Sequence, residues 1–595
     1  MGVFSCPLLE RCLESYPDAN TAGLIRTRLA QAGDLAALLP LYDQAIPVLE
    51  AAMWESALAP ARVADCHALF AEMEVHIAAA GDDPRHAFVV VVPVADRPQH
   101  LRTCLESLAG AAQAFHYGAG KVMAVIADDS RDAANITENK TIAEAIRQAG
   151  VEVIYFGQDE QLAELDALAA SERQGLQNII GTAAPDAFSH KGASITRNIT
   201  YLMLNRMAQD DKNRLFMFVD SDQEFHANTG TSRRVFTTNY FYHIDRIFRE
   251  SRAEVLTGKV VGDPPVSPAV MAGTLLEDVL AFLTEISGLE ADTPCTFHRD
   301  TSSNEGAAYH DMAVLFGFEH SGEAHRFQCR LQGPHNNAAC LTGFADRLNH
   351  FFNGEHPTRV TPYQHTDVQG SVTAARTVYT GNYVLSPGAL KYFIPFAGLQ
   401  LRMAGPVLGR LVQASSGKNF VSANLPMLHR RSVEEKGGSG FRTGVDNSAP
   451  VVDLSGEFER QFFGDVMLFT VIDLVEQGYP GKLLLSADIR AQVMATENRM
   501  REQYMEMQQR VMTRLDDLEA LLSDDGRWWN NDQYAGSRTR FGQFTAALRA
   551  NFGTDARAWQ LIDDEAHREA RRAAIVDALS SYRLDRQSWE QALQK

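Results

Sequence analysis

Two aspartates directly follow a short apolar run near the middle of the chain. Residues 215–219 read Leu-Phe-Met-Phe-Val, and Asp220, Ser221 and Asp222 come next. An apolar run of this length that ends in polar residues is typical of a buried strand in a parallel sheet. Ligands of such sheets bind beyond the carboxyl ends of the strands. Two carboxylates placed there, one residue apart, suit a hard divalent cation such as Mg²⁺ or Mn²⁺.

The same sequence also fits a strand that ends in an ordinary Asp-rich turn, so the preceding segments are needed to decide between the two interpretations. Apolar, β-branched runs predict strands at residues 88–93, 122–127 and 151–156. Between the first two, apolar residues from Leu101 onwards recur with helical spacing, which predicts a βαβ unit. Neither a GxGxxG nor a Walker sequence follows a strand. The sequence therefore lacks the main signature of a dehydrogenase or a P-loop protein, and these two interpretations are disfavoured.

More polar residues stand where these predicted elements end or begin. Asp128 and Asp129 follow the second strand, while Lys191 and Arg197 lie near the first turns of a further helix. A helix amino terminus with cations beside it forms an anion-binding site. The alternative for the two cations, a solvated basic pair, is left open by these residues alone.

The order of these segments resembles the GT-A glycosyltransferases, particularly the family-2-like enzymes. The segments are VVVVPVADRPQHLRTCLESL, IADDS, KGASITRN and LFMFVDSD, and PVADRPQHL also looks like the opening of β-1,4-galactosyltransferases. The resemblance covers about residues 86–262. It implies an α/β fold of the GT-A type, Rossmann-like with a mostly parallel sheet, and helical extensions at both ends of the chain. It also implies metal-dependent transfer from a UDP- or GDP-sugar to an acceptor hydroxyl.

The resemblance assigns roles to individual residues of this chain. It implies that Asp128 or Asp129 holds the base or ribose, and that Gly381 and Asn382 border the donor sugar. The residues expected to bind the donor are Pro93, Asp96, Arg97, Asp128, Asp129, Lys191, Arg197, Asp220, Ser221, Gly381 and Asn382. The expected ligands of Mn²⁺ or Mg²⁺ are Asp220, Asp222 and His429, the last at the end of an apolar run.

The chain departs from the family where a catalytic base is usual. Residues 402–405 read Arg-Met-Ala-Gly and hold no carboxylate. One explanation is a retaining enzyme, in which the phosphate of the donor takes the acceptor proton, and we favour it slightly. The other is an inverting enzyme with its base elsewhere. The candidates for that base are Glu277, Asp278, Asp346 and Glu355, although Glu277 and Asp278 also fit the acidic first turn of a helix.

The rest of the chain divides by composition. We expect a helical region over 1–83, a nucleotide-sugar-binding half over 84–290, an insertion over 291–375, an acceptor half over 376–490 and a helical region over 491–595.

The insertion is rich in His and Cys. Cys295 with His298, and His325 with Cys329, have ligand-like spacing, but structural zinc usually shows tighter pairs. An acceptor pocket is therefore the preferred interpretation. Its residues would be Asp346, Glu355, His356 and Arg359.

The helical region at the end of the chain carries an apolar seam. Its residues, at helical spacing, are Tyr504, Met507, Val511, Leu515, Leu518 and Leu522. A seam of this kind predicts a helical cap or a homo-oligomer interface. A role in docking the acceptor is a further alternative.

Composition limits the partners and the compartment. The 595 residues carry a net charge of −20, which argues against a nucleic-acid surface or attraction to anionic lipid. The chain shows no secretory signal and no long apolar run, and its seven cysteines make no disulfide framework. We therefore expect a cytoplasmic protein with no integral membrane segment. A nucleotidyltransferase acting on a sugar phosphate and an inactive GT-A-like scaffold are the alternatives.

Overall fold

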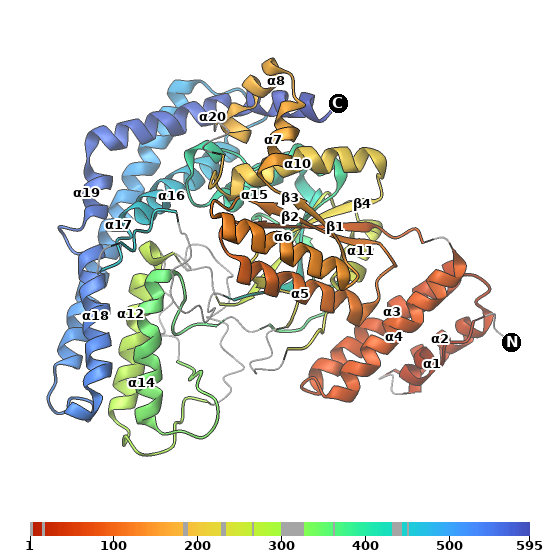
Figure 1. Ribbon diagram of the computed structural model, residues 1–595, viewed down its shortest axis with the longest axis horizontal. Coiled ribbons are helices and arrows are strands. Elements are labelled where there is room, and N and C mark those ends of the chain that lie inside the picture. The colour runs from red at the N-terminus through yellow and green to blue at the C-terminus, as the bar shows by residue number, and fades with distance from the viewer. Residues whose placement is uncertain are drawn as a thin grey trace.

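A central sheet of nine strands organises the molecule, with helices on both of its faces (Figure 1). This confirms the expected α/β class and the helical regions at both ends of the chain. The computed structural model describes residues 4–14, 18–81, 83–182, 188–227, 234–263, 267–298, 327–360, 363–430, 443–448 and 451–594.

One half of the sheet is parallel and the other half is mixed. The strands are β1 (Ala87–Val94), β2 (Val122–Asp128), β3 (Glu152–Phe156), β4 (Arg214–Val219), β5 (Gln223–Glu224), β6 (Val255–Gly262), β7 (Thr373–Ala374), β8 (Asn382–Leu385) and β9 (Phe420–His429). Their order is β3-β2-β1-β4-β8-β6-β9-β5, and β7 pairs with β9. The first four strands are parallel, and so are β6 and β9, whereas β8 runs antiparallel to both β4 and β6.

Helices connect the parallel strands. They are α5 (Pro98–Phe115), α6 (Ala133–Gln148) and α10 (Ala193–Asp210). Because each crossover returns the chain to the same end of the sheet, the carboxyl ends of β1, β2 and β4 meet at one edge. Residues 93–97, 128–130 and 220–222 are thereby brought together although the sequence separates them.

The strands bury apolar side chains on both faces. Val89 and Val91 of β1 belong to one buried cluster, while Phe88, Val90 and Val92 belong to another. Successive side chains of a strand point to opposite faces, so a continuous apolar run is required when both faces are covered. This is why the strands were recognisable as unbroken apolar runs.

The first cluster includes the helices of the C-terminal region. Residues of α12 (Pro268–Ser287), α14 (Asn337–Leu348), α15 (Ala404–Ser416), α16 (Ser455–Glu476) and α17 (Ser486–Leu522) contribute to it. All but the last residue of the predicted seam are fully buried in α17, which packs on α12, α16, α18 and α20 of the same chain. The seam therefore forms a helical cap within the chain, and an oligomer remains a prediction.

The helix that carries Glu277 and Asp278 begins earlier than expected. The sequence suggested that these acids form an acidic first turn, but α12 starts at Pro268 and both lie in its middle. That interpretation was wrong because the helix start is set by Ser267 and a proline at its first position, the usual place for proline in a helix.

The second cluster joins the other face of the sheet to the N-terminal helices. These are α1 (Pro7–Glu14), α2 (Ala19–Gln31), α3 (Leu35–Glu55) and α4 (Pro60–Ala80). Among the described residues α3 alone is long and apolar enough to cross a membrane, judged by length and composition only. It packs against α4, and its buried Glu50 bonds to His243 of α11 (Tyr240–Glu250) over 2.9 Å, so it serves as a core helix here.

The remaining helices and the 3₁₀ turns complete the described chain. They are α7 (Gln158–Asp166), α8 (Ala170–Gly175), α9 (Gln177–Ile180), α18 (Ala535–Phe552), α19 (Arg557–Asp563) and α20 (Glu565–Leu593), with 3₁₀ turns η3 (Asn349–Asn353), η4 (Pro387–Lys391), η5 (Ala397–Leu399), η6 (Gly417–Asn419) and η7 (Asp532–Tyr534).

Candidate functional site

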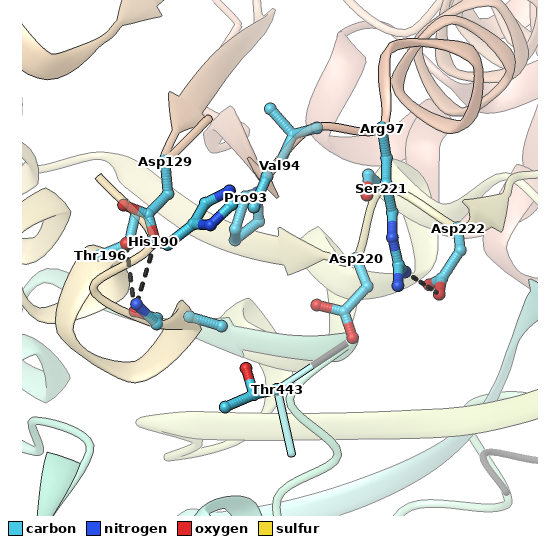
Figure 2. A pocket seen from close by; sticks show the side chains of 13 residues that line it. Pro93, Val94, Arg97, Asp129, His190, Thr196, Asp220, Ser221, Asp222 and Thr443 are labelled. Atoms are coloured by element: carbon cyan, nitrogen blue, oxygen red, sulfur yellow. Dashed lines mark hydrogen bonds and ion pairs between the residues drawn. The ribbon is translucent and has the colours of Figure 1, made fainter. Parts of the chain in front are cut away.

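A cavity of about 260 Å³ lies at the carboxyl ends of β1, β2 and β4 (Figure 2). Its lining residues are Pro93, Val94, Ala95, Arg97, Asp129, His190, Gly192, Ala193, Thr196, Asp220, Ser221, Asp222 and Thr443. Many of the residues predicted to bind the donor are among them. The edge of a parallel sheet thus forms a site from residues of separate segments, as the sequence predicted.

Asp222 and His429 come together beside this cavity. His429 Nε2 lies 3.5 Å from Asp222 Oδ2 because β5 pairs with the end of β9. The other ring nitrogen, Nδ1, donates a hydrogen bond to the carbonyl oxygen of Asp263 over 2.5 Å. That bond fixes the ring so that Nε2 faces the carboxylate, as second-shell partners do for metal-binding histidines. Arg97 Nη1 also lies 3.8 Å from Asp222 Oδ2.

Asp220 points elsewhere in this structure. Its carboxylate forms an ion pair with the buried Arg197 of α10, although about a third of the side chain remains exposed. Gly381 lies against it: a Cβ at residue 381 would come within 2.8 Å of Asp220 Oδ2 and 2.4 Å of Gln223 Nε2. A side chain at residue 381 would therefore displace the ends of the Asp220 and Gln223 side chains. Within the described chain, Asp220 does not complete a three-ligand cluster with Asp222 and His429.

Asp129 anchors the start of α10 at the cavity. It accepts hydrogen bonds from Lys191 Nζ at 2.6 Å and from the Gly192 amide at 3.0 Å. Burial lowers the pKa of Lys191, and Asp129 opposes that effect. The amino terminus of α10, with Ala193 and Thr196 in the lining, supplies partial positive charge to the cavity. The predicted anion site thus has its helix end in place, while Lys191 and Arg197 are each paired with a carboxylate.

Three predicted donor residues make internal bonds. Asp96 accepts from the amides of Arg131 and Asp132, from Asn135 and, at 2.5 Å, from His190 Nε2. These bonds hold the pKa of Asp96 below its usual value, against the opposing effect of burial.

The other two are deeply buried. Asp128 accepts from Tyr155 at 2.7 Å and from Asn139 at 2.9 Å. Asn382 donates to the carbonyls of Lys259 and Leu425. Asp96, Asp128 and Asn382 therefore shape the loops around the cavity.

Sequence reasoning missed three polar side chains that line the cavity. His190 and Thr196 flank the predicted Lys191 segment, and Thr443 comes from a distant part of the chain. His190 stands at a φ of +53°, an uncommon conformation for a residue other than glycine. Its position directly before Lys191 was the one signal available for it, whereas Thr443 had none.

The four carboxylates proposed as a base are all paired with arginines. Glu277 lies 3.9 Å from Arg514 and Asp346 lies 2.7 Å from Arg540, both on C-terminal helices. Asp278 bonds to Arg359 at 2.7 Å, while Glu355 pairs with Arg347 and lies 3.3 Å from Arg330. None of these four acids is among the residues that line the cavity.

The preferred acceptor pocket of the insertion is not assembled as one group. Asp346 faces α18, whereas Arg359 binds Asp278 and also donates its amide to His356 Nδ1. Glu355 lies instead among Arg330, Arg347 and His350. His325, whose spacing from Cys329 the sequence analysis noted, lies outside the described residues.

A second cavity of about 390 Å³ adjoins the first. It shares Ser221 and Asp222 with it and is lined on its other side by arginines. Its further lining residues are His100, Thr103, Cys104, Gln223, Glu224, Arg234, Arg347 and Arg430. The two-aspartate turn therefore separates two spaces, one at the parallel strand ends and one beside β5 and β9.

Comparison with known proteins gives little similarity. No protein-family model matches the chain, and no curated protein matches it. Among solved structures, the mannosyltransferase PcManGT from Pyrobaculum calidifontis, in complex with GDP-Man and Mn²⁺, aligns with a TM-score of 0.31 and 8% identity. That alignment covers 86% of this chain and 99% of the other. Mouse xyloside xylosyltransferase 1, in its apo form, aligns with a TM-score of 0.21 and 10% identity, over 57% and 78%. Both scores are too low to show a shared fold.

Proposed function

We propose that this chain is a glycosyltransferase that uses a nucleotide-diphosphate sugar and Mn²⁺. The observation that carries the proposal is a cavity at the carboxyl ends of the strands, lined by Asp222 and the amino terminus of α10, with His429 Nε2 3.5 Å from the Asp222 carboxylate. The order of motifs in the sequence, which resembles the GT-A enzymes, supports the same assignment. A phosphate-bearing ligand would find both a metal site and a helix end there.

The donor atoms at this edge fit a divalent transition ion. Asp222 offers a carboxylate oxygen, and His429 offers an imidazole nitrogen whose partner nitrogen is already bonded. A histidine in the set favours Mn²⁺ over Mg²⁺, which prefers oxygen ligands alone. Asp222 and His429 would hold the ion, and Asp220 would join them by leaving Arg197. When bound, the ion supplies Lewis-acid stabilisation of the charge on the departing nucleotide diphosphate.

The residues of this chain would then position the two substrates. Arg97 and the first amides of α10 would bind the diphosphate, because both carry positive charge beside the cavity. The Arg197 guanidinium, released from Asp220, would add a cation there. The second cavity would take the acceptor, since it reaches the same Asp222 from the opposite side.

The stereochemical outcome we propose is retention. None of the four relocated base candidates lines either cavity, so none is placed to take the proton of an acceptor bound there. Retention requires no carboxylate at residues 402–405. Proton NMR of the first-formed glycoside, from a donor of known anomeric configuration, tests this, and an inverted centre would reject it.

The transfer itself is tested by incubating the full chain with UDP- and GDP-sugars and a panel of hydroxyl acceptors. Released UDP or GDP, dependent on Mn²⁺ and on acceptor, is the expected result. Pyrophosphate release from a nucleoside triphosphate and a sugar phosphate would instead identify a nucleotidyltransferase. If neither reaction occurs and no nucleotide-sugar raises the melting temperature, the result would support the alternative of an inactive scaffold.

A further inference from the structure

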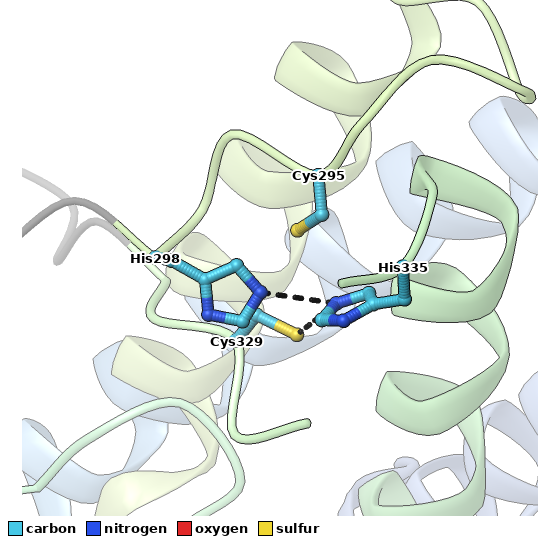
Figure 3. A group of neighbouring side chains, drawn as sticks. All are labelled: Cys295, His298, Cys329 and His335. Atoms are coloured by element: carbon cyan, nitrogen blue, oxygen red, sulfur yellow. Dashed lines mark hydrogen bonds between the residues drawn. The ribbon is translucent and has the colours of Figure 1, made fainter. Parts of the chain in front are cut away.

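Four metal-ligating side chains meet outside the two cavities of the sheet edge, in the insertion between α12 and α14 (Figure 3). They are Cys295, His298, Cys329 and His335, and their ligand atoms all lie within 4.8 Å of one another. His335 Nε2 is 3.1 Å from His298 Nε2 and 3.3 Å from Cys329 Sγ. Two thiols and two imidazoles in one small volume are a ligand set that suits zinc.

The chain holds the four residues together by backbone bonds. The Cys295 amide donates to the His335 carbonyl at 2.9 Å, and the Cys329 amide donates to the Phe297 carbonyl at 3.0 Å. Residues 294 and 336 also form an antiparallel bridge. The ligands therefore come from two segments, one after α12 and one before α14, that are paired directly with each other.

Buried aromatic rings anchor both segments. Phe297 and Phe327 each pack on Phe282 of α12, with ring centroids 5.0 and 4.4 Å apart, and Phe327 also packs on Phe344 of α14. Each ring lies within two residues of a ligand in the sequence. The positions of the thiols and imidazoles are thereby set by a packed core.

The second shell of one ligand is already formed. His335 Nδ1 donates to the Gly333 carbonyl at 2.8 Å, which leaves its Nε2 lone pair facing Cys329 and His298. A backbone carbonyl in this role is the usual partner of a zinc-binding histidine. The buried Cys340 of α14 lies beside the thiols, within hydrogen-bonding range of Cys295 and Cys329, and completes the polar surroundings.

We propose that Cys295, His298, Cys329 and His335 bind a structural Zn²⁺ ion that ties the end of α12 to the start of α14. With Zn–S near 2.3 Å and Zn–N near 2.0 Å, tetrahedral ligands lie about 3.3–3.8 Å apart. The separations of 3.1 and 3.3 Å around His335 Nε2 already lie within a few tenths of an ångström of that spacing, and the widest separation, at most 4.8 Å, would contract by about 1.5 Å at most. Four protein ligands close the coordination sphere, which is the arrangement of a structural site and leaves no position for a substrate.

The test is the metal content of the purified full-length chain after dialysis against metal-free buffer. One zinc per chain is expected in the wild type and in Cys12→Ser, a matched control whose half-buried thiol lies in α1. Cys295→Ser with Cys329→Ser should lose the metal. Zinc-free wild-type protein, or a double variant that keeps its zinc, would overturn the proposal.

Two further measurements remain decisive if the double variant does not fold. Wild-type protein stripped by a chelator should take up Co²⁺ with the strong visible absorption of a tetrahedral thiolate site, and Zn²⁺ should displace it. Failure to bind either ion would overturn the proposal. All seven cysteines should also titrate as thiols after zinc release, since a disulfide between Cys295 and Cys329 would lower that count by two.

A substitution of His298, the exposed ligand of the four, tests whether it belongs to the ligand set. His298→Gln should lose zinc, while Cys340→Ser should keep it. The reverse result would replace His298 by Cys340 and overturn the assignment. None of these readouts depends on glycosyl transfer, so their failure is distinct from failure of the proposed function.

Discussion

The two proposed metal sites differ in the number and kind of ligands that the fold supplies. At the sheet edge, Asp222 lines a cavity and His429 lies 3.5 Å from it, so these two ligands would leave most coordination positions of an ion open, with Arg97 nearby. In the insertion, four side chains converge on one point and close it. Oxygen and nitrogen ligands with open positions suit a metal that works on a substrate, whereas thiolates and imidazoles in a closed set suit a metal that holds the fold.

The common element is the second shell. In both sites a histidine donates Nδ1–H to a backbone carbonyl, of Asp263 in one and Gly333 in the other, so that Nε2 is presented to the partner ligand. The same local device thus serves an open and a closed site. Function at each site follows from how many ligands the surrounding fold supplies.

The largest expected effect is on transfer. Asp222→Asn removes the metal-binding charge while it keeps the shape of the side chain, so we expect the rate to fall at least about a thousandfold, or roughly 4 kcal/mol of barrier. The melting temperature and the zinc content should stay close to wild type. A folded Asp222→Asn protein with near-normal turnover would break the distinction between the two sites.

The next effect is on stability alone. Cys329→Ser opens the closed site, and loss of a structural metal should lower the free energy of unfolding by about 3 kcal/mol. Turnover per folded molecule, measured well below the melting temperature, should change less than twofold. The comparison fails if the variant keeps its stability but loses transfer.

A smaller effect is expected when the histidine at the open site is changed. His429→Gln removes one ligand from a set that keeps open positions, so the Mn²⁺ concentration for half-maximal activity should rise about a hundredfold, or about 2.7 kcal/mol. Activity should recover largely at saturating Mn²⁺. A Mn²⁺ titration of both proteins measures this, and an unchanged midpoint would remove His429 from the site.

Asp465 is a buried acid outside both proposed metal sites, and it serves as a control for the comparison between them. Burial raises the pKa of Asp465 on α16 to about 7, although Tyr504 at 2.5 Å and Gln461 at 2.8 Å donate to it. The unfolded pKa is near 3.8, so the native state binds the extra proton, and stability falls as pH rises from about 4 to about 7.

The substitution Asp465→Asn should remove this loss of stability at higher pH. The variant should unfold with a free energy about 4 kcal/mol higher than wild type at pH 8, because one pKa unit is worth about 1.4 kcal/mol, and close to that of wild type at pH 4. Chemical denaturation at the two pH values checks this, with zinc content and transfer unchanged. An equal gain at both pH values would show that packing, and not ionisation, is responsible.

Much of the sheet could be read from the chain because its strands are buried on both faces. The apolar runs predicted β1, β2, β3 and β4 to within one residue at each end. Of the residues that the family resemblance placed at the site, Arg97, Asp129 and Asp222 line the cavity, whereas Asp96, Asp128 and Asn382 do not. These signals are local, since an unbroken apolar run followed by aspartates can be recognised from one short segment of the sequence.

Other features depended on partners distant in sequence. The pairing of Asp220 with Arg197 and the internal bonds of Asp96 and Asp128 follow from how loops meet, which residue types do not reveal. The antiparallel β8 between β4 and β6 was also invisible, because a four-residue apolar strand has no direction of its own.

The amino-acid sequence by itself determined the α/β class and the strand ends that carry carboxylates, because strands buried on both faces appear as unbroken apolar runs. It also determined the helical ends of the chain, through apolar residues at helical spacing. It also contained both halves of the Cys/His site, but Cys295-x-x-His298 and Cys329 with His335 are separated by residues 299–328 and look like two weak signals. Backbone bonds between the two segments, with the packing of Phe297 and Phe327 between α12 and α14, bring them together. A metal site is defined by distances between ligands, and those distances are set by the tertiary structure.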